Sequence, residues 1–262
     1  MSGENGRSAE RRVWLGYLSE KVKPGMVVEF GCGSGSVLEI LSAQFPESVF
    51  VGIDKSVERL AAMSERELRN VIPVRADISE NVFQDHTFDT GLFVGSLHEV
   101  YSYLGEKKVQ STFKMAHDVL KGSGLVIIQD FLKPYPRKVR IGFKNDVTCE
   151  KFLRFSEEFR PRKIRYERKK SGFVLDLADA VEFISKYRSP SEEDWTEEMN
   201  ETHFFFTEQQ YREVARRTGF VAGTLTRLPR SETWWAERRK DIRFEYESEY
   251  VWIQFVLKKG QF

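Results

Sequence analysis

A run of alternating glycines directly follows an apolar segment near the start of the sequence. Residues 27–35 read Val-Val-Glu-Phe-Gly-Cys-Gly-Ser-Gly, and Asp54 ends the next apolar segment, 19 positions further on. Glycine lets the backbone adopt a positive φ and lie close to a ligand, and a helix opening at Ser36 would turn its free N–H groups toward the same place. We therefore predict a pocket for a nucleotide-like ligand. The Asp54 carboxylate would accept hydrogen bonds from a ribose diol, a contact worth about 1.5–3 kcal/mol.

The spacing of these glycines argues against a dinucleotide. Counted from Gly31, the sixth position of the loop is Ser36 where a dinucleotide fingerprint has glycine, and the additional glycine is Gly35. Glu29 places a carboxylate beneath the loop, where it would repel a diphosphate and attract an ammonium or sulfonium group. The loop therefore favours a positively charged ligand, and a nicotinamide-dependent reductase is the least expected function.

Residues 27–35 resemble motif I of the class I S-adenosylmethionine-dependent methyltransferases, in which an acidic residue precedes Gly-x-Gly-x-Gly. The resemblance covers roughly half of the chain, from its start to Leu132, and implies S-adenosylmethionine as the cofactor. It places Asp54 on the ribose hydroxyls, Asp77 on the adenine amine, and residues 88–97 as the fourth strand with its exit to the active site. The cofactor-binding residues implied in this way are Glu29, Gly31, Cys32, Gly33, Gly35, Asp54, Lys55, Asp77, Ile78 and Val94.

The elements that must position these residues alternate along the chain. Short apolar runs predict strands at 26–30, 49–53, 71–75, 90–94 and 124–129, and amphipathic patterns predict helices at 36–44, 56–68 and 106–120. This alternation predicts an α/β fold with a doubly wound, mostly parallel sheet, which the resemblance extends to a seven-stranded Rossmann-like methyltransferase fold. Ligands of such sheets lie beyond the carboxyl ends of the strands, where the predicted cofactor residues converge.

The remaining segments divide the chain into three parts. We expect an N-terminal helix at residues 1–22, a cofactor-binding core at residues 23–132 and 207–262, and an insertion between strand five and the last helix at residues 131–206. Thr207 opens that helix with a capping box, and residues 220–228 and 248–257 read as the closing strand pair. Within the insertion, residues 173–187 pattern as an amphipathic helix. The resemblance implies that the insertion is a substrate-recognition lid.

His98 is the predicted catalytic residue. It follows the fourth strand on the side where the methyl group should point, and a histidine is suited to accept a proton near neutral pH. The alternative is that His98 lines the pocket without moving a proton. The predicted substrate-binding residues are Trp14, Tyr17, His98, Tyr101 and Tyr103, although a tryptophan at helical spacing also suits a core.

Few features indicate other chemistry. The two cysteines, Cys32 and Cys149, are too few for a disulfide framework, and the four histidines make no metal-ligand spacing with them, so we predict no metal. Cys32 is a small residue that fits between glycines, which makes a nucleophilic role unexpected. No apolar run approaches the ~18 residues that span a bilayer, and we expect a cytoplasmic protein without membrane association.

The net charge of +1 conceals an uneven distribution. Residues 133–170 hold 14 Lys and Arg against five Asp and Glu, whereas residues 192–201 hold six acids and no base. The two segments could face each other or be solvated. The basic segment could instead form an electropositive wall for an anionic substrate or for nucleic acid.

These observations favour an S-adenosylmethionine-dependent methyltransferase that acts on a nitrogen or oxygen of a small-molecule metabolite. An insertion that encloses the acceptor suits a small substrate better than an open groove does. The alternatives are a methyltransferase of RNA or another polyanion, supported by the basic segment, and a non-catalytic cofactor-binding partner subunit. The oligomeric state stays open.

Overall fold

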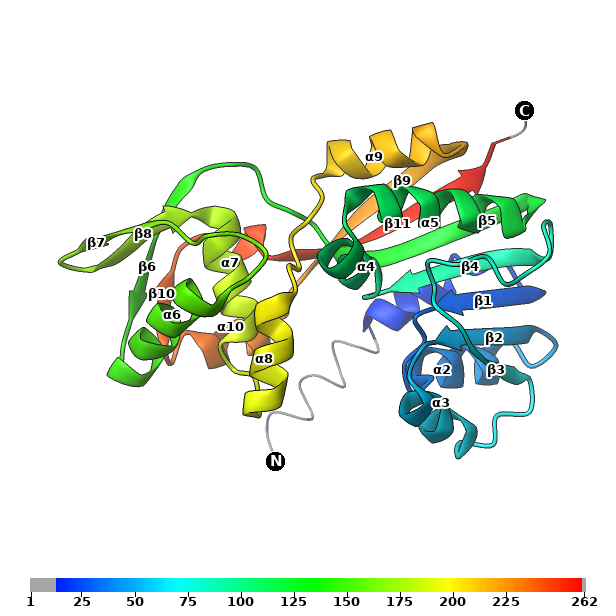
Figure 1. Ribbon diagram of the computed structural model, residues 1–262, viewed down its shortest axis with the longest axis horizontal. Coiled ribbons are helices and arrows are strands. Elements are labelled where there is room, and N and C mark those ends of the chain that lie inside the picture. Colours follow the sequence, from blue (N-terminus) through cyan, green and yellow to red (C-terminus); the bar gives the residue numbers. More distant parts are fainter. Residues whose placement is uncertain (1–12, 261–262) are drawn as a thin grey trace.

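The computed structural model describes residues 13–260 and shows two bodies side by side (Figure 1). The larger body is built on a seven-stranded sheet, and the smaller one on a four-stranded sheet. No helix in the described range is long and apolar enough to cross a membrane.

The main sheet has the strand order β3-β2-β1-β4-β5-β11-β9. Its strands are β1 (Met26–Phe30), β2 (Val49–Asp54), β3 (Val71–Arg75), β4 (Phe88–Val94), β5 (Leu120–Phe131), β9 (Phe220–Pro229) and β11 (Val251–Lys259). The first five strands pair in parallel, whereas β11 runs antiparallel to both β5 and β9. The predicted doubly wound, mostly parallel, seven-stranded fold is therefore confirmed.

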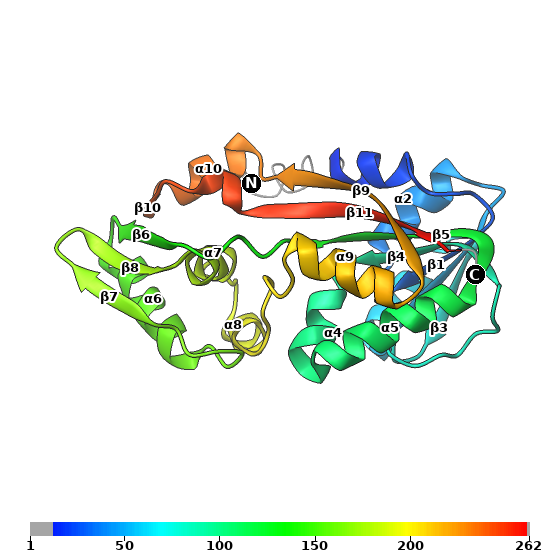
Figure 2. The same cartoon turned by 90° about the horizontal axis from the view of Figure 1, so that it is seen from above.

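Helices cover both faces of this sheet (Figure 2). One face packs against α2 (Ser36–Gln44), α3 (Val57–Ser64) and the N-terminal helix, which is described from residue 13 to 19. The other face packs against α4 (Leu97–Leu104), α5 (Glu106–Val119) and α9 (Glu208–Arg217). Val27 and Val28 of β1 point to opposite faces, and both are fully buried. Burial on both faces explains why the inner strands are continuous apolar runs rather than alternating ones.

Local sequence signals fix the ends of several of these helices. The Ser56 hydroxyl accepts a hydrogen bond from the Arg59 amide (3.1 Å) at the start of α3. Thr207 and Gln210 form the predicted capping box at the start of α9. The predicted N-terminal helix lies partly outside the described residues, which begin at residue 13.

The smaller body is a four-stranded antiparallel sheet with its own hydrophobic core. Its strands are β6 (Lys138–Phe143), β7 (Tyr166–Lys169), β8 (Gly172–Asp176) and β10 (Ile242–Phe244), and its helices are α6 (Asp146–Glu158), α7 (Leu177–Lys186), α8 (Glu192–Asn200) and α10 (Glu232–Arg238). A single 3₁₀ turn, η1, spans Glu247–Glu249 before β11 begins. Because β10 pairs with β6, the smaller body combines the insertion with a segment from 207–262 that the sequence assigned to the core.

The prediction of one helix over residues 173–187 was wrong in its first part. Residues 172–176 form β8, which pairs with both β6 and β7, and α7 begins only at Leu177. Phe173 and Leu175 are buried and alternate with partly exposed residues, which is the pattern of a strand. The apolar residues of the helix that follows directly made the whole segment look helical in the sequence.

The basic and acidic segments meet in the smaller body. Arg154 of α6 donates two hydrogen bonds to the carboxylate of Glu192 at the start of α8, at 2.9 and 2.6 Å. Arg162 pairs with Asp179 (2.7 Å), so part of the positive charge of the basic segment is neutralised within the fold. The expectation that the two segments face each other holds at Arg154 and Glu192.

Candidate functional site

The glycine loop is tied to the neighbouring strand β2. The amides of Gly31 and Cys32 both donate to the Ile53 carbonyl (2.9 Å each), and the Gly33 amide donates to Oδ2 of Asp54 (2.9 Å). Oδ1 of Asp54 accepts from the Ser56 amide (2.9 Å). The Asp54 carboxylate therefore holds together the turn after β1 and the start of α3.

Two buried carboxylates, Glu29 and Asp54, make the loop electronegative. Glu29 is 1% exposed and Asp54 is 6% exposed. Burial, together with the charges of Glu29 and Asp54, raises the pKa of the Cys32 thiol far above its usual range. A thiolate at Cys32 is therefore strongly disfavoured, in agreement with the expectation that this cysteine is not a nucleophile.

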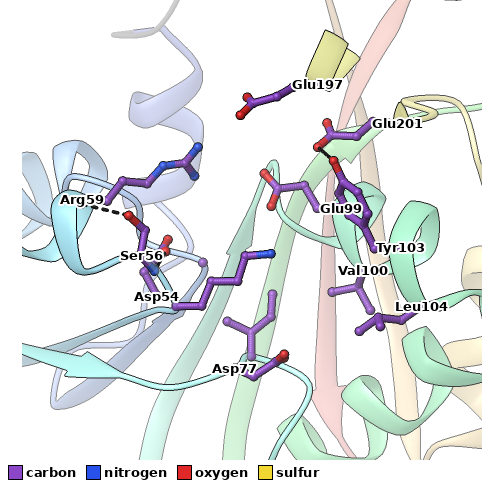
Figure 3. A pocket seen from close by; sticks show the side chains of 13 residues that line it. Asp54, Ser56, Arg59, Asp77, Glu99, Val100, Tyr103, Leu104, Glu197 and Glu201 are labelled. Carbon is purple, nitrogen blue, oxygen red and sulfur yellow. Dashed lines mark hydrogen bonds between the residues drawn. The ribbon is translucent and has the colours of Figure 1, made fainter. Parts of the chain in front are cut away.

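A pocket of about 420 Å³, called the first pocket below, opens beside the glycine loop (Figure 3). Its lining includes five carboxylates but only two bases, Lys55 and Arg59. The residues lining it are Gly31, Asp54, Lys55, Ser56, Arg59, Asp77, Ile78, Glu99, Val100, Tyr103, Leu104, Glu197 and Glu201. An excess of negative charge suits a cationic ligand and opposes a diphosphate.

Several polar groups of the first pocket are held in place. Oδ1 of Asp77 accepts from the Ser79 amide (2.8 Å), and the hydrogen bond with Ser79 lowers the pKa of Asp77. The Tyr103 hydroxyl donates to Oε1 of Glu201 (2.9 Å), while the Lys55 ammonium lies 5.6 Å from the centre of the Tyr103 ring. Glu201 follows α8, so the smaller body supplies one wall of this pocket.

A second pocket, of about 530 Å³, lies beyond the carboxyl ends of β4 and β5. Its lining is aromatic and basic, and the described residues that line it include no Asp or Glu. These residues are Trp14, Leu15, Val37, Val94, Gly95, His98, Gln129, Ser185, Arg230, Trp234, Arg238, Tyr250 and Trp252. The two pockets therefore differ in charge, and the second one combines residues from both bodies.

His98 lines the second pocket and lies near one residue of the first. Its Nδ1 lies 2.8 Å from Oδ1 of Asp130, and its backbone amide donates to Oδ2 of Asp130 (3.1 Å). Its Nε2 lies 4.0 Å from Oε2 of Glu201, which lines the first pocket. Burial opposes a charge on the imidazole, but the charge and hydrogen bond of Asp130, with Glu99 and Glu201, raise the pKa of His98 to about 9.

Three potential metal ligands, His98, Glu201 and His203, lie within 4.8 Å of one another. His203 already contacts other groups, because its Nδ1 lies 3.1 Å from the Ser185 hydroxyl and its Nε2 lies 3.3 Å from Oε2 of Glu198. Burial and the nearby ammonium of a lysine lower the pKa of His203. These contacts explain the placement of His203 without a metal, and the absence of a metal stays a prediction.

The structure gathers most of the predicted site residues. Asp54, Lys55, Asp77, Ile78, Gly31 and Tyr103 line the first pocket, and Trp14, Val94 and His98 line the second. Cys32, Gly33 and Gly35 belong to the turn beside the first pocket, and Glu29 lies in β1, which leads into that turn. Tyr17 and Tyr101 line neither pocket. Tyr17 is 43% exposed, and Tyr101 packs on Phe205 and Phe206.

Sequence reasoning missed Asp130, Glu201 and Arg238. Asp130 lies near the carboxyl end of β5, and this position could have marked it as a site residue, as it did for Asp54. Glu201 and Arg238 belong to the smaller body, and no sequence motif near them indicates that they line a pocket.

Gly35 provides a stability test of the loop. Its φ is +75°, and a Cβ there would lie 2.3 Å from Cγ of Met63, so we expect Gly35→Ala to lower the free energy of unfolding by about 1–3 kcal/mol. Gly33 is the matched control, since its φ is +53° but a Cβ there would meet no described atom within 4 Å. Urea unfolding should therefore show a larger loss for Gly35→Ala than for Gly33→Ala, and equal losses would contradict the packing argument.

Comparisons with known proteins point in one direction. Residues 27–124 match the family described as "Methyltransferase domain". A segment of 57 residues is 37% identical to trans-aconitate 2-methyltransferase of Acidovorax sp. (strain JS42), and it spans only 22% of this chain and 22% of that protein.

Solved structures share the fold over nearly the whole chain. An S-adenosylmethionine-dependent methyltransferase from Mesorhizobium loti superposes with a TM-score of 0.61 at 15% identity, covering 94% of this chain and 97% of that one. The 1,6-didemethyltoxoflavin-N1-methyltransferase of Burkholderia thailandensis was solved with 1,6-didemethyltoxoflavin and S-adenosylhomocysteine. It gives a TM-score of 0.54 at 14% identity, and the match covers 99% of this chain and 80% of that one.

Proposed function

Because this chain contains a methyltransferase domain of the class I S-adenosylmethionine-dependent family, we propose that it methylates a nitrogen or oxygen of a small molecule. S-adenosylmethionine binds at the first pocket and glycine loop, and the acceptor binds in the second pocket. The observation that carries this proposal is the contrast in charge between two pockets, with His98 of the second lying 4.0 Å from Glu201 of the first.

The residues of the first pocket suit the adenosine part of the cofactor. Asp54 keeps lone pairs for the ribose hydroxyls beside the two backbone amides that it already accepts. Asp77 is positioned to accept from the adenine amine, and Ile78 offers an apolar surface to the ring. The open space above Gly33 and the buried carboxylate of Glu29 suit the charged methionine part.

The second pocket suits a small acceptor. Val94 and Gly95 lie at the end of β4, and Ser185 of α7 and Trp234 of α10 enclose the pocket from the smaller body. A pocket of this size, with mostly apolar walls and few polar groups, is typical of small-molecule sites. The 1,6-didemethyltoxoflavin-N1-methyltransferase of Burkholderia thailandensis, solved with bound 1,6-didemethyltoxoflavin, offers a precedent on the same fold.

S-adenosylmethionine supplies a methyl group on a positively charged sulfur, so the protein mainly has to align the acceptor and exclude water. With the cofactor held by the glycine loop and Asp54, its methyl carbon would be the electrophile for the acceptor oxygen or nitrogen, and the sulfur would leave with the electron pair of the carbon–sulfur bond. His98 in its neutral form accepts the acceptor's proton at Nε2, while Asp130 holds the ring by Nδ1.

Calorimetric titration tests the cofactor first. We expect S-adenosylhomocysteine to bind with a 1:1 stoichiometry and NADH not to bind, because the first pocket carries excess negative charge. Binding of NADH alone would overturn the proposal. Radiolabelled methyl transfer across a panel of small acceptors then tests the reaction. Methyl transfer to RNA alone would favour the polyanion alternative, and cofactor binding without any product would favour a non-catalytic partner subunit.

A further inference from the structure

The second pocket contains two buried N–H donors without a described acceptor. Nε of Arg238 and Nε1 of Trp252 are both buried and make no hydrogen bond within the described residues. Arg238 is only 7% exposed, and the one hydrogen bond of its side chain within the described residues runs from Nη1 to the Trp234 carbonyl (3.3 Å). A buried guanidinium and a buried indole N–H are costly unless an acceptor reaches them.

No carboxylate among the described residues of the pocket balances the charge of Arg238. The described lining includes no carboxylate, whereas it includes Arg230 and His98 as further bases. Burial lowers the pKa of Arg238 to about 10, which leaves the group charged at neutral pH. The charge of Arg238 therefore has no carboxylate partner among the described residues that line the pocket.

The walls beside Arg238 are planar and aromatic. Its guanidinium lies 3.3 Å from the centre of the Trp234 ring, and the Arg230 guanidinium lies 4.6 Å from the centre of the Trp14 ring. The rings of Trp14 and Trp252 stack on each other, with their centres 5.2 Å apart. Flat aromatic walls favour a flat ligand, because ring stacking adds to the area buried.

We propose that the second pocket binds a planar aromatic anion, with its carboxylate on Arg238 and Trp252 and its nucleophilic atom toward His98. The anion supplies the missing acceptor for both N–H donors. This inference rests on the proposed function, since it names the class of acceptor that the methyltransferase would modify.

The test compares two probes of the same shape, 2-naphthoate and 2-naphthamide, by calorimetry on the full chain without cofactor. We expect the acid to bind about ten- to a hundredfold more tightly than the neutral amide, because charge-assisted hydrogen bonds are the stronger ones. The variant Arg238→Gln should reduce this preference to near unity. Trp252→Phe, which keeps an aromatic ring but loses Nε1, should reduce it in part.

Arg239→Gln is the matched control. Arg239 is the next residue, but it pairs with Glu232 and Glu247 on the surface and does not line the pocket, so its loss should leave the preference unchanged. Equal affinity of the unaltered protein for acid and amide would overturn the proposal whether or not Arg238→Gln folds. A preference for the acid that survives Arg238→Gln in a folded variant would also overturn it.

The outcomes separate this inference from the proposed function. If the protein prefers the acid but does not bind S-adenosylhomocysteine, the anion pocket is supported and the methyltransferase proposal is contradicted. If it binds S-adenosylhomocysteine but shows no preference for the acid, the anion pocket is contradicted and the proposed cofactor is still supported.

Discussion

Replacing Asp54 with alanine should weaken the binding of S-adenosylhomocysteine by about a hundredfold or more. The side chain accepts hydrogen bonds from the amides of Gly33 and Ser56, so its loss frees the glycine loop from the start of α3. The same change removes the acceptor proposed for the ribose hydroxyls. The free energy needed to order the loop on binding would lower the affinity further, beyond the loss of the hydrogen bond to the ribose. Calorimetric titration of the variant measures the effect directly.

Asp89→Ala is the matched control for Asp54→Ala. Oδ2 of Asp89 also accepts from a backbone amide of the main sheet, that of Met26 (3.0 Å), and it pairs with Lys121 (2.6 Å). Met26 begins β1, so this anchor lies at the opposite end of the strand from the glycine loop. The control should lose stability but keep its affinity for S-adenosylhomocysteine. Unchanged affinity in Asp54→Ala would contradict the role assigned to Asp54.

Replacing His98 with alanine should slow methyl transfer by about a hundredfold or more at pH 9, the size of effect expected for a general base. Only neutral His98 can accept a proton, and its pKa is raised to about 9. The rate of the unaltered enzyme should therefore increase as the pH rises toward 9, and the variant should lose this dependence. Steady-state rates between pH 6 and 10 at saturating cofactor would measure both effects.

Asp130 acts on this profile through His98. The variant Asp130→Asn removes the charge that raises the pKa of His98, so the rising part of the profile should move to lower pH. His117→Ala is the control, since His117 is also buried but packs on Phe220 of the main core and lines neither pocket. A small loss of rate in His98→Ala, with the pH profile unchanged, would mean that His98 only shapes the pocket.

Much of the larger body could be predicted because its signals are local. The bounds of β1 and α2 match the expected 26–30 and 36–44, and the capping box at Thr207 marks the start of α9. Each of these signals depends on residues a few positions apart, through side-chain alternation, helical spacing or a cap. In the smaller body the strand and helix patterns adjoin each other, so the sequence predicted one helix where a strand at 172–176 is followed directly by a helix.

The sequence by itself determined the glycine loop, the carboxylates at the strand ends and the kind of cofactor that they favour, because these features follow from residue type and short spacing. Only the tertiary structure brought Asp130 to His98, which lies 32 positions away, and Arg238 to a pocket that also contains Trp14. Contacts over such separations depend on how two bodies pack and on which buried charges find partners, and no short pattern in the chain encodes them. The predicted cofactor loop thus depends on local sequence, whereas the second pocket depends on the tertiary fold.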